Sequence, residues 1–163
     1  MDKILRRVID NNFSDLAGLT IDASIPVPES LINELIASEL RRNRNISGCR
    51  VTIHSENRVS MDLKSPRLPL TLHLKLRLFR AVDLTHSPKI RAFLENNILL
   101  GKLGSLFNAL PEGVTLYENQ ITVDIVSFLS TAEQKQILEL LRSVEIRTEA
   151  GKMVFDVKIA VDE

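Results

Sequence analysis

Apolar and polar residues follow two different spacings along this chain, and each spacing predicts a different kind of element. From Pro28 to Arg42 the apolar residues recur with the period of one helix face. Proline suits the first turn of a helix, and the charge of Glu29 favours the positive end of the helix dipole. We therefore predict a helix over 28–42. Its apolar face consists of Leu31, Ile32, Leu35, Ile36 and Leu40.

Helical spacing also occurs in three other segments. Residues 1–17 show an amphipathic pattern, and 98–110 carries leucines along one side. A further helix is expected to begin at Thr131, because Thr131 and Gln134 have the spacing of a capping box. The apolar face of that helix is expected to consist of Ile137, Leu138 and Leu141.

Strict alternation of apolar and polar residues predicts strands elsewhere. Residues 19–25 alternate as a half-buried strand does, and Pro26 and Pro28 are expected to end it because proline cannot donate to a ladder. The longest alternation runs from Leu68 to Leu78 and predicts a strand of about 35 Å. The remaining strands are expected in three hairpins, over 49–63, 114–126 and 144–161, and in a single strand over 89–94.

A helix followed by a hairpin therefore occurs three times, beginning at Pro28, Ile98 and Thr131. Strands joined by hairpins are antiparallel, and the helices can cover the apolar face of the resulting sheet. We predict an α+β fold in which a long, strongly curved antiparallel sheet wraps on one side around helices. The 163 residues fit a single domain over 1–163, in which 19–161 forms the curved sheet with its helices and 1–17 is an amphipathic N-terminal helix.

Composition narrows the classes of partner and chemistry. The chain has 21 basic and 21 acidic residues, and this balance argues against a nucleic-acid partner. Cys49 is the single cysteine, so an intrachain disulfide and every multi-cysteine zinc site are ruled out, and we expect Cys49 to be a small buried hydrophobe. No apolar run is long enough to span a membrane. We therefore expect a cytoplasmic protein, with contact at a membrane surface as the alternative.

The sequence shows no recognisable set of catalytic residues, so we do not expect an enzyme. The sequence contains neither a nucleophile-elbow motif nor a phosphate-binding glycine loop. His54 and His73 lie on polar strand phases, but a third metal ligand is not evident, and solvated strand histidines are the simpler interpretation. Asp62 and Asp124 face outward on separate hairpins without neighbours that would tune them for acid–base work. We expect no catalytic residues, no metal and no cofactor.

The excess of apolar faces is the more informative feature. Either a closed core absorbs them, or a sheet curled around helices leaves an elongated apolar cavity of the kind that accepts an acyl chain. The second alternative predicts a protein that binds a lipid or another hydrophobic small molecule. The candidate ligand-lining residues, chosen because their apolar phases should face the interior, are Leu35, Ile36, Leu72, Leu74, Leu76, Leu103, Phe107, Phe155 and Val157.

Charged and edge positions offer a surface for partners. His73, Lys75 and Arg77 follow one strand face and are candidates to meet lipid headgroups or another anionic surface, with a solvated strand face as the alternative. The helix over 1–17 either packs on its own domain or lies in a membrane interface. If the core is closed, we expect instead a protein–protein interaction module that acts through a sheet edge or this helix, with a homodimer among its forms.

Four segments resemble a known family. The run from Ile25 to Asn33 leads through two prolines into a helix, and a hairpin turns at Glu56-Asn57. Together with the segments 99–103 and 119–124, this order resembles the tubular lipid-binding (TULIP) superfamily, and within it the LmeA-type bacterial phospholipid-binding proteins. The order of elements matches over 19–161. The resemblance implies a curved antiparallel sheet wrapped about a helix and a lipid bound in an apolar groove.

Overall fold

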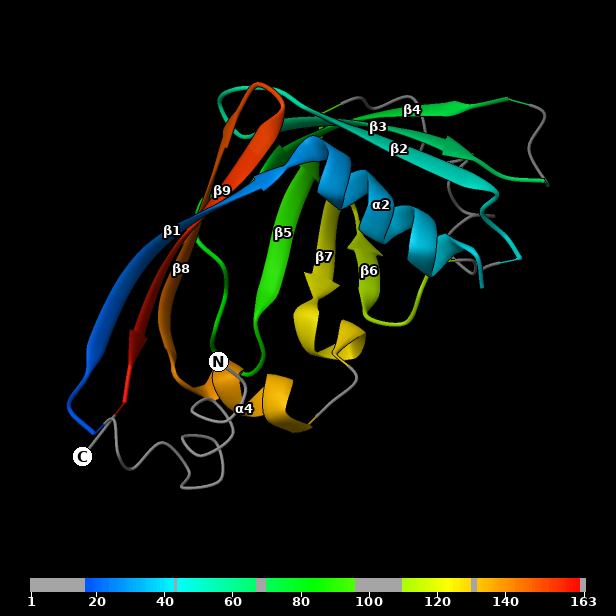
Figure 1. The fold of residues 1–163 in the computed structure, drawn as a ribbon. Helices are drawn as coiled ribbons and strands as arrows, with labels where there is room; N and C mark the ends of the chain where they lie inside the picture. Colours follow the sequence, from blue (N-terminus) through cyan, green and yellow to red (C-terminus); the bar gives the residue numbers. More distant parts are fainter. Residues whose placement is uncertain (1–16, 43, 67–69, 96–109, 130–131, 162–163) are drawn as a thin grey trace.

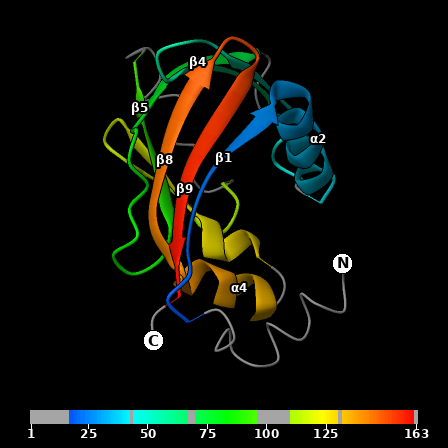
Figure 2. The ribbon, with the colours of Figure 1, turned by 60° about the vertical axis from the view of Figure 1, so that its left-hand side comes forward.

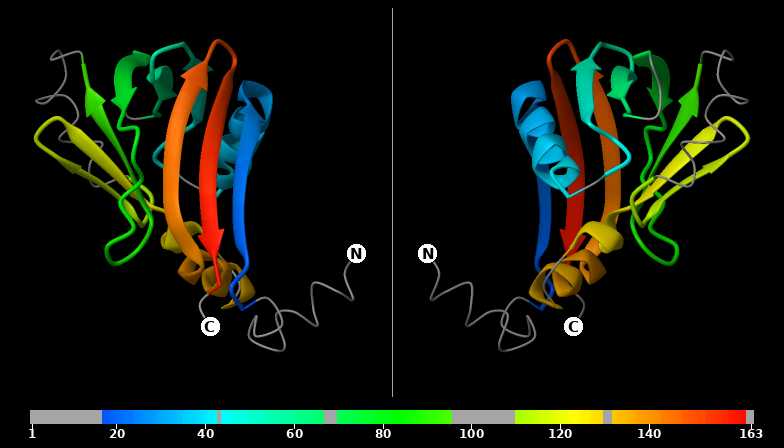
Figure 3. Two further views of the ribbon diagram at one scale, coloured as in Figure 1. Left: turned by 90° about the vertical axis from the view of Figure 1, so that its left-hand side faces the viewer. Right: turned by 90° about the vertical axis from the view of Figure 1, so that its right-hand side faces the viewer.

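The strands form two antiparallel sheets, so the α+β class is confirmed, but the strands are divided between two sheets where one was expected. The computed structural model describes residues 17–42, 44–66, 70–95, 110–129 and 132–161. A three-stranded sheet has the order β1-β9-β8, with β9 in the middle (Figures 1 and 3). Its strands are β1 (Thr20–Pro28), β8 (Leu141–Glu149) and β9 (Lys152–Ala160).

The second sheet has six strands in the order β2-β3-β4-β5-β7-β6, and each neighbouring pair is antiparallel. The predicted turn between its first two strands is present, because Asn57 has a φ of 58° and Glu56 a φ of 60°. These left-handed conformations suit a tight hairpin. The strands are β2 (Gly48–Ile53), β3 (Arg58–Lys64), β4 (Leu72–Leu78), β5 (Lys89–Leu94), β6 (Val114–Tyr117) and β7 (Gln120–Asp124).

Helices connect and cover these sheets. The helix predicted over 28–42 is present as α2 (Glu29–Leu40), which follows β1 directly and runs beside β2 (Figures 1 and 2). A short 3₁₀ helix, η3 (Ile125–Phe128), follows β7, and α4 (Ala132–Glu139) precedes β8. Residues 1–16 of the helix predicted over 1–17, and residues 98–109 of the helix predicted over 98–110, lie outside the described residues. Thr131, the predicted start of the third helix, also lies outside the described residues, so two of the three predicted helix-plus-hairpin units include a segment that the structure does not describe.

Two clusters of buried side chains hold the described part together. The first lies on the inner face of β2, β3, β4 and β5, where Ile32 and Ile36 of α2 pack against it. The second lies between β8, β9 and the chain after β4, and contains Val82, Val144 and Ile146. Leu78 and Met153 pack against both clusters, so the two form adjoining parts of one interior. The buried residues of the first cluster are Val51, Ile53, Val59, Leu72, Leu74, Leu76, Ala92 and Leu94.

The long strand predicted over 68–78 is shorter than expected. It begins at Leu72, and Leu70 lies outside it with 68 % of its surface exposed. The reason is register: Leu72 pairs with Leu63 at the end of the β3–β4 ladder, and β3 ends at Lys64. Leu70 and Thr71 consequently lie beyond the end of this ladder, and alternation alone cannot extend a strand beyond its ladder. Residues 68 and 69 of the predicted strand lie outside the described residues.

The strand predicted over 19–25 was wrong in two respects. It continues through Pro26 and Pro28, because β1 is an edge strand and its even-numbered residues direct their backbone groups away from β9. A proline at such a position removes no ladder hydrogen bond. It is also not half-buried, since Ile21 is 43 % and Ile25 is 49 % exposed.

The helix before the last hairpin also ends earlier than its apolar spacing predicted. The α4 helix ends at Glu139, and Leu141 is the first residue of β8 rather than part of the helix face. The N–H of Ala160 donates to the carbonyl of Leu140, so the chain is already hydrogen-bonded to β9 at this point. Pairing with β9 therefore determines this boundary.

Candidate functional site

The edge of β2 that has no neighbouring strand is capped by side chains of α2. The amide of Asn33 imitates a neighbouring strand: its Nδ2 donates to the carbonyl of Val51 at 2.8 Å, and its Oδ1 accepts from the N–H of Val51 at 2.7 Å. One turn earlier, the carboxylate of Glu29 accepts from the N–H of Ile53 at 2.8 Å. The N–H of Gly151, at the β8–β9 turn, donates to the carbonyl of Ile53. This edge therefore has partners for its backbone groups and is joined to the other sheet.

The outer edge of β8 is capped in the same manner. The side chain of Asn57 donates to the carbonyl of Ile146 at 2.9 Å and accepts from the N–H of Thr148 at 3.0 Å. Further along the edge, the N–H of Ile146 donates to the carbonyl of Arg80, and the N–H of Val82 donates to the carbonyl of Val144. The outer edge of β8 is thereby hydrogen-bonded to the chain that follows β4. Sequence reasoning identified Asn57 only as a turn residue and Asn33 only as the end of a helix-leading run, and it missed the capping role of both side chains.

The apolar face of the three-stranded sheet is covered at one side and open at the other. On β8, Val144 and Ile146 are buried; on β9, Phe155 is half-buried; and on β1, Ile21 and Ile25 are exposed. These residues share one face because β8, β9 and β1 pair in register, with Phe155 opposite both Ile25 and Ile146. We call the side near β1 the open apolar face. It consists of Ile21, Ala23, Ile25, Phe155 and Val157.

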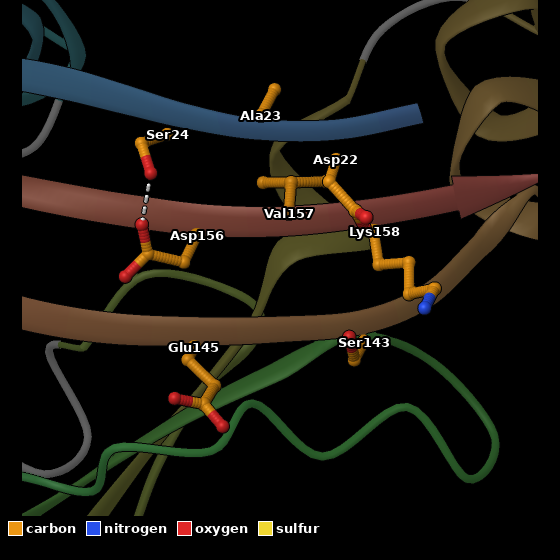
Figure 4. A pocket seen from close by; sticks show the side chains of 8 residues that line it. All are labelled: Asp22, Ala23, Ser24, Ser143, Glu145, Asp156, Val157 and Lys158. Atoms are coloured by element: carbon orange, nitrogen blue, oxygen red, sulfur yellow. Dashed lines mark hydrogen bonds between the residues drawn. The ribbon is translucent and has the colours of Figure 1, made fainter. Parts of the chain in front are cut away.

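The opposite, polar face of the same sheet carries a shallow depression of about 270 Å³. The hydroxyl of Ser24 donates to Asp156 (Figure 4). Arg147 Nε donates to the same carboxylate at 2.8 Å. These two partners, first the hydroxyl and then the guanidinium, hold the pKa of Asp156 below its ordinary value. Because the carboxylate of Asp156 already has two partners in the fold, Asp156 belongs to a hydrogen-bonded surface and is not an acid held ready for catalysis. Its lining residues are Asp22, Ala23, Ser24, Ser143, Glu145, Asp156, Val157 and Lys158.

The predicted ligand-lining residues fall into three places. Ile36, Leu72, Leu74 and Leu76 belong to the first core cluster, where Ile36 is its half-buried neighbour and the leucines are buried. Phe155 and Val157 pack against the second cluster, and Leu35 projects from α2 with 59 % of its surface exposed. Leu103 and Phe107 lie outside the described residues. Their role in ligand binding stays a prediction, and of the set only Phe155 and Val157 belong to the open apolar face.

The predicted headgroup residues lie on the outer face of the six-stranded sheet. His73, Lys75 and Arg77 alternate along β4 with its buried leucines, so they point away from the interior. The Nδ1 atom of His73 lies 2.6 Å from Asp62, and Arg77 Nε lies 3.0 Å from Glu95. A headgroup whose acyl chain lies on the open apolar face would therefore have to reach around the six-stranded sheet to contact these three side chains.

The remaining candidate for reactivity is Cys49, which is half-buried beside the first core cluster. Burial, with a smaller contribution from the charge of Asp62, raises the pKa of the Cys49 thiol to about 11. A thiol with so high a pKa carries little thiolate near neutral pH and is a poor nucleophile. Its placement agrees with the sequence-based interpretation of a buried hydrophobe.

Within the described ranges, no group of three His, Cys, Asp or Glu side chains is placed to hold a metal ion. Nor does that part of the chain contain a helix long and apolar enough to cross a membrane. Comparison of the sequence and structure with family models, curated proteins and solved structures found no match.

Proposed function

We propose that this protein binds a hydrophobic ligand, in the simplest case an acyl chain, against the open apolar face of its three-stranded sheet. The observation that supports the proposal most is the rise in exposure across one apolar face, from buried Ile146 through half-buried Phe155 to exposed Ile25. An exposed apolar strip continuous with a buried core lets an apolar chain replace water over its whole length. Burial gains roughly 25 cal/mol for each Å² of apolar surface removed from water.

The finer architecture belongs to the same proposal. We propose a sheet curved about its helices, built from three helix-plus-hairpin units, in the manner of the tubular lipid-binding proteins that the sequence resembles. The strand–helix junction from Ile25 through α2 supports it, because it carries the quoted motif and has the predicted order of elements. In this proposal the protein is a non-enzymatic binder, and His73, Lys75 and Arg77 meet an anionic surface from the outside of the sheet.

A fluorescent fatty acid such as parinaric acid provides the test, with paired variants on β1. Ile21→Glu places a charge on the open apolar face, whereas Thr20→Glu places the same charge on the next residue, which points to the opposite face. Both positions are exposed, so both variants should fold. We expect the wild type and Thr20→Glu to take up the probe, and Ile21→Glu to bind it at least about tenfold more weakly, which corresponds to about 1.4 kcal/mol.

A different result would favour the other function class. If the wild type takes up neither fatty acid nor phospholipid, the ligand-binding proposal fails, and an interaction module with a closed core becomes the better account. If both glutamate variants lose the probe equally, the ligand does not lie on the face that we propose.

A further inference from the structure

The outer edge of β1 is treated differently from the edges of β2 and β8, which also have no neighbouring strand on one side of their sheets. Asn33 and Asn57 cap the edges of β2 and β8 with amide groups that imitate a strand. Within the described residues, β1 pairs with β9 on one side only (Figure 3). Unpaired edge strands are templates for another strand, and proteins usually protect them. This edge has one visible protection, the prolines at its C-terminal end.

The backbone of β1 determines which residues can form that pairing. Odd-numbered residues bond to β9, as the bond from the N–H of Val161 to the carbonyl of Leu19 indicates. The N–H and C=O groups of Thr20, Asp22 and Ser24 therefore point outward. Pro26 and Pro28 have the same phase and lack an N–H, so donors are restricted to the first half of the strand. The edge thus offers a short ladder of defined position.

From these features we propose that two copies of the chain associate through antiparallel pairing of their β1 strands about a twofold axis at Ala23. In this register Asp22 of one copy and Ser24 of the other form a pair that exchanges two backbone hydrogen bonds, and symmetry repeats it. Ala23 faces its own counterpart at the axis. An isologous contact of this kind closes on itself and gives a dimer.

Side chains favour this register over its neighbours. On the apolar face, Ile21 of each copy lies opposite Ile25 of the other, so side chains that are 43 % and 49 % exposed cover one another. A shift of two residues toward the N-terminus would place Asp22 opposite itself, and like charges directly opposite are destabilising. A shift in the other direction would place Asp22 opposite Pro26, so that only Ser24, opposite itself at the axis, exchanges two hydrogen bonds, whereas the proposed register has two such pairs. The small side chain of Ala23 allows the close approach at a position without backbone bonds.

The dimer would join two three-stranded sheets into one continuous sheet of six strands. Its apolar faces would meet at the axis, and the open apolar face of each copy would continue into that of the other. The inference does not require that a ligand binds there, because it rests on the backbone and register of β1. The contact is short, so we expect reversible association that depends on protein concentration.

Cysteine cross-linking in the full-length protein tests both association and register. In a Cys49→Ala background, Ala23→Cys places two thiols across the axis, where Cα atoms of such a pair lie about 4.5 Å apart, within the range of a disulfide. Ile21→Cys is the matched control on the same strand and face, because it faces Ile25 and not itself. We expect Ala23→Cys to form a covalent dimer about a hundredfold faster than Ile21→Cys, since an aligned pair reacts at a high effective concentration. Mixing Ile21→Cys with Ile25→Cys should restore cross-linking.

Light scattering during size-exclusion chromatography gives the second readout. The wild-type mass should rise from 18.4 kDa toward twice that value as the concentration increases. Asp22→Pro removes one outward N–H and should keep the protein monomeric, while its circular dichroism spectrum stays unchanged. The proposal is overturned if the wild type remains at 18.4 kDa at every concentration and Ala23→Cys cross-links no faster than Ile21→Cys. A dimer that cross-links at another position, or one that Asp22→Pro leaves intact, would equally contradict it.

Discussion

The amide of Asn33 is expected to contribute more to stability than any other polar side chain on α2. Substituting Asn33→Leu preserves the approximate shape of the side chain and improves helix propensity, but it removes both hydrogen bonds to Val51. Val51 is buried, so its N–H and C=O would lose their partners inside the fold. An unsatisfied buried backbone group costs about 1–3 kcal/mol.

The two lost bonds together should destabilise the protein by about 2–4 kcal/mol, with the lower half favoured because Asn33 is half-buried and water can approach. For a chain of this size, each kcal/mol lowers the melting temperature by about 2–4 °C. We therefore expect the melting temperature to fall by about 5–15 °C. Urea unfolding followed by circular dichroism measures the free energy directly.

A matched control lies on the neighbouring residue of the same helix. Glu34→Ala alters an exposed side chain and should change the stability by no more than about 0.5 kcal/mol. Asn33→Asp separates the two bonds, because the carboxylate still accepts from Val51 but can no longer donate to it. If Asn33→Leu is as stable as Glu34→Ala, water or a shifted helix satisfies the edge of β2, and the reasoning about the amide cap is refuted.

Three further predictions concern single positions. Gly113 has a φ of 88°, and a Cβ added there would lie 2.4 Å from the Cβ of Ser127, whereas Gly151 has a φ of 79° and no atom within 4 Å of an added Cβ. Gly113→Ala should therefore destabilise the protein by at least about 1 kcal/mol more than Gly151→Ala in thermal unfolding. The thiol of Cys49, whose pKa is about 11, should react with a disulfide reagent at roughly pH 8 on the order of a hundredfold more slowly in the native protein than in urea; equal rates would contradict its burial. The lowered pKa of Asp156 adds stability that is present above its ordinary value of 3.8 and is lost as the pH falls through the lower folded-state pKa. Asp156→Asn should therefore flatten the stability profile in that acidic range, and a profile identical to wild type would exclude the effect.

Strongly periodic segments were predicted well because local pattern and tertiary burial agree there. The helix over 28–42 and the strand over 89–94 were both found, since each has an apolar face that the core clusters use. The hairpin turn at Glu56-Asn57 was found because few residues accept a positive φ without strain. In such segments the local preference and the final packing favour the same conformation.

The errors arise where pairing with a neighbouring strand, and not the local pattern, determines the extent of an element or the role of a residue. Leu70 continues the alternation of β4 but has no neighbour on β3, so it lies outside the strand. Pro26 is compatible with β1 only because β1 is an edge strand, which the sequence of that segment does not reveal. The role of Asn33 depends on the position of β2 beside α2, although its spacing of four residues from Glu29 is a signal that both side chains lie along one line of the helix.

The sequence predicted which strand faces are apolar, but not which apolar face stays open. Phe155 and Val157 lie on an apolar sheet face, as their spacing predicts, and their role in ligand binding stays a prediction. Leu72, Leu74 and Leu76 have the same alternation, yet they form the buried core. Periodicity identifies which face of a strand is apolar, whereas only the arrangement of α2 and the two sheets determines which apolar face stays open.

Ligand binding on the open apolar face is tested most directly by native mass spectrometry of the purified full-length protein, followed by solvent extraction. The account predicts a stoichiometric adduct on the 18.4 kDa chain that extracts as a lipid, and its loss in Ile21→Glu but not in Thr20→Glu. A mass without adduct in all three proteins, even after addition of fatty acids and phospholipids, would contradict it.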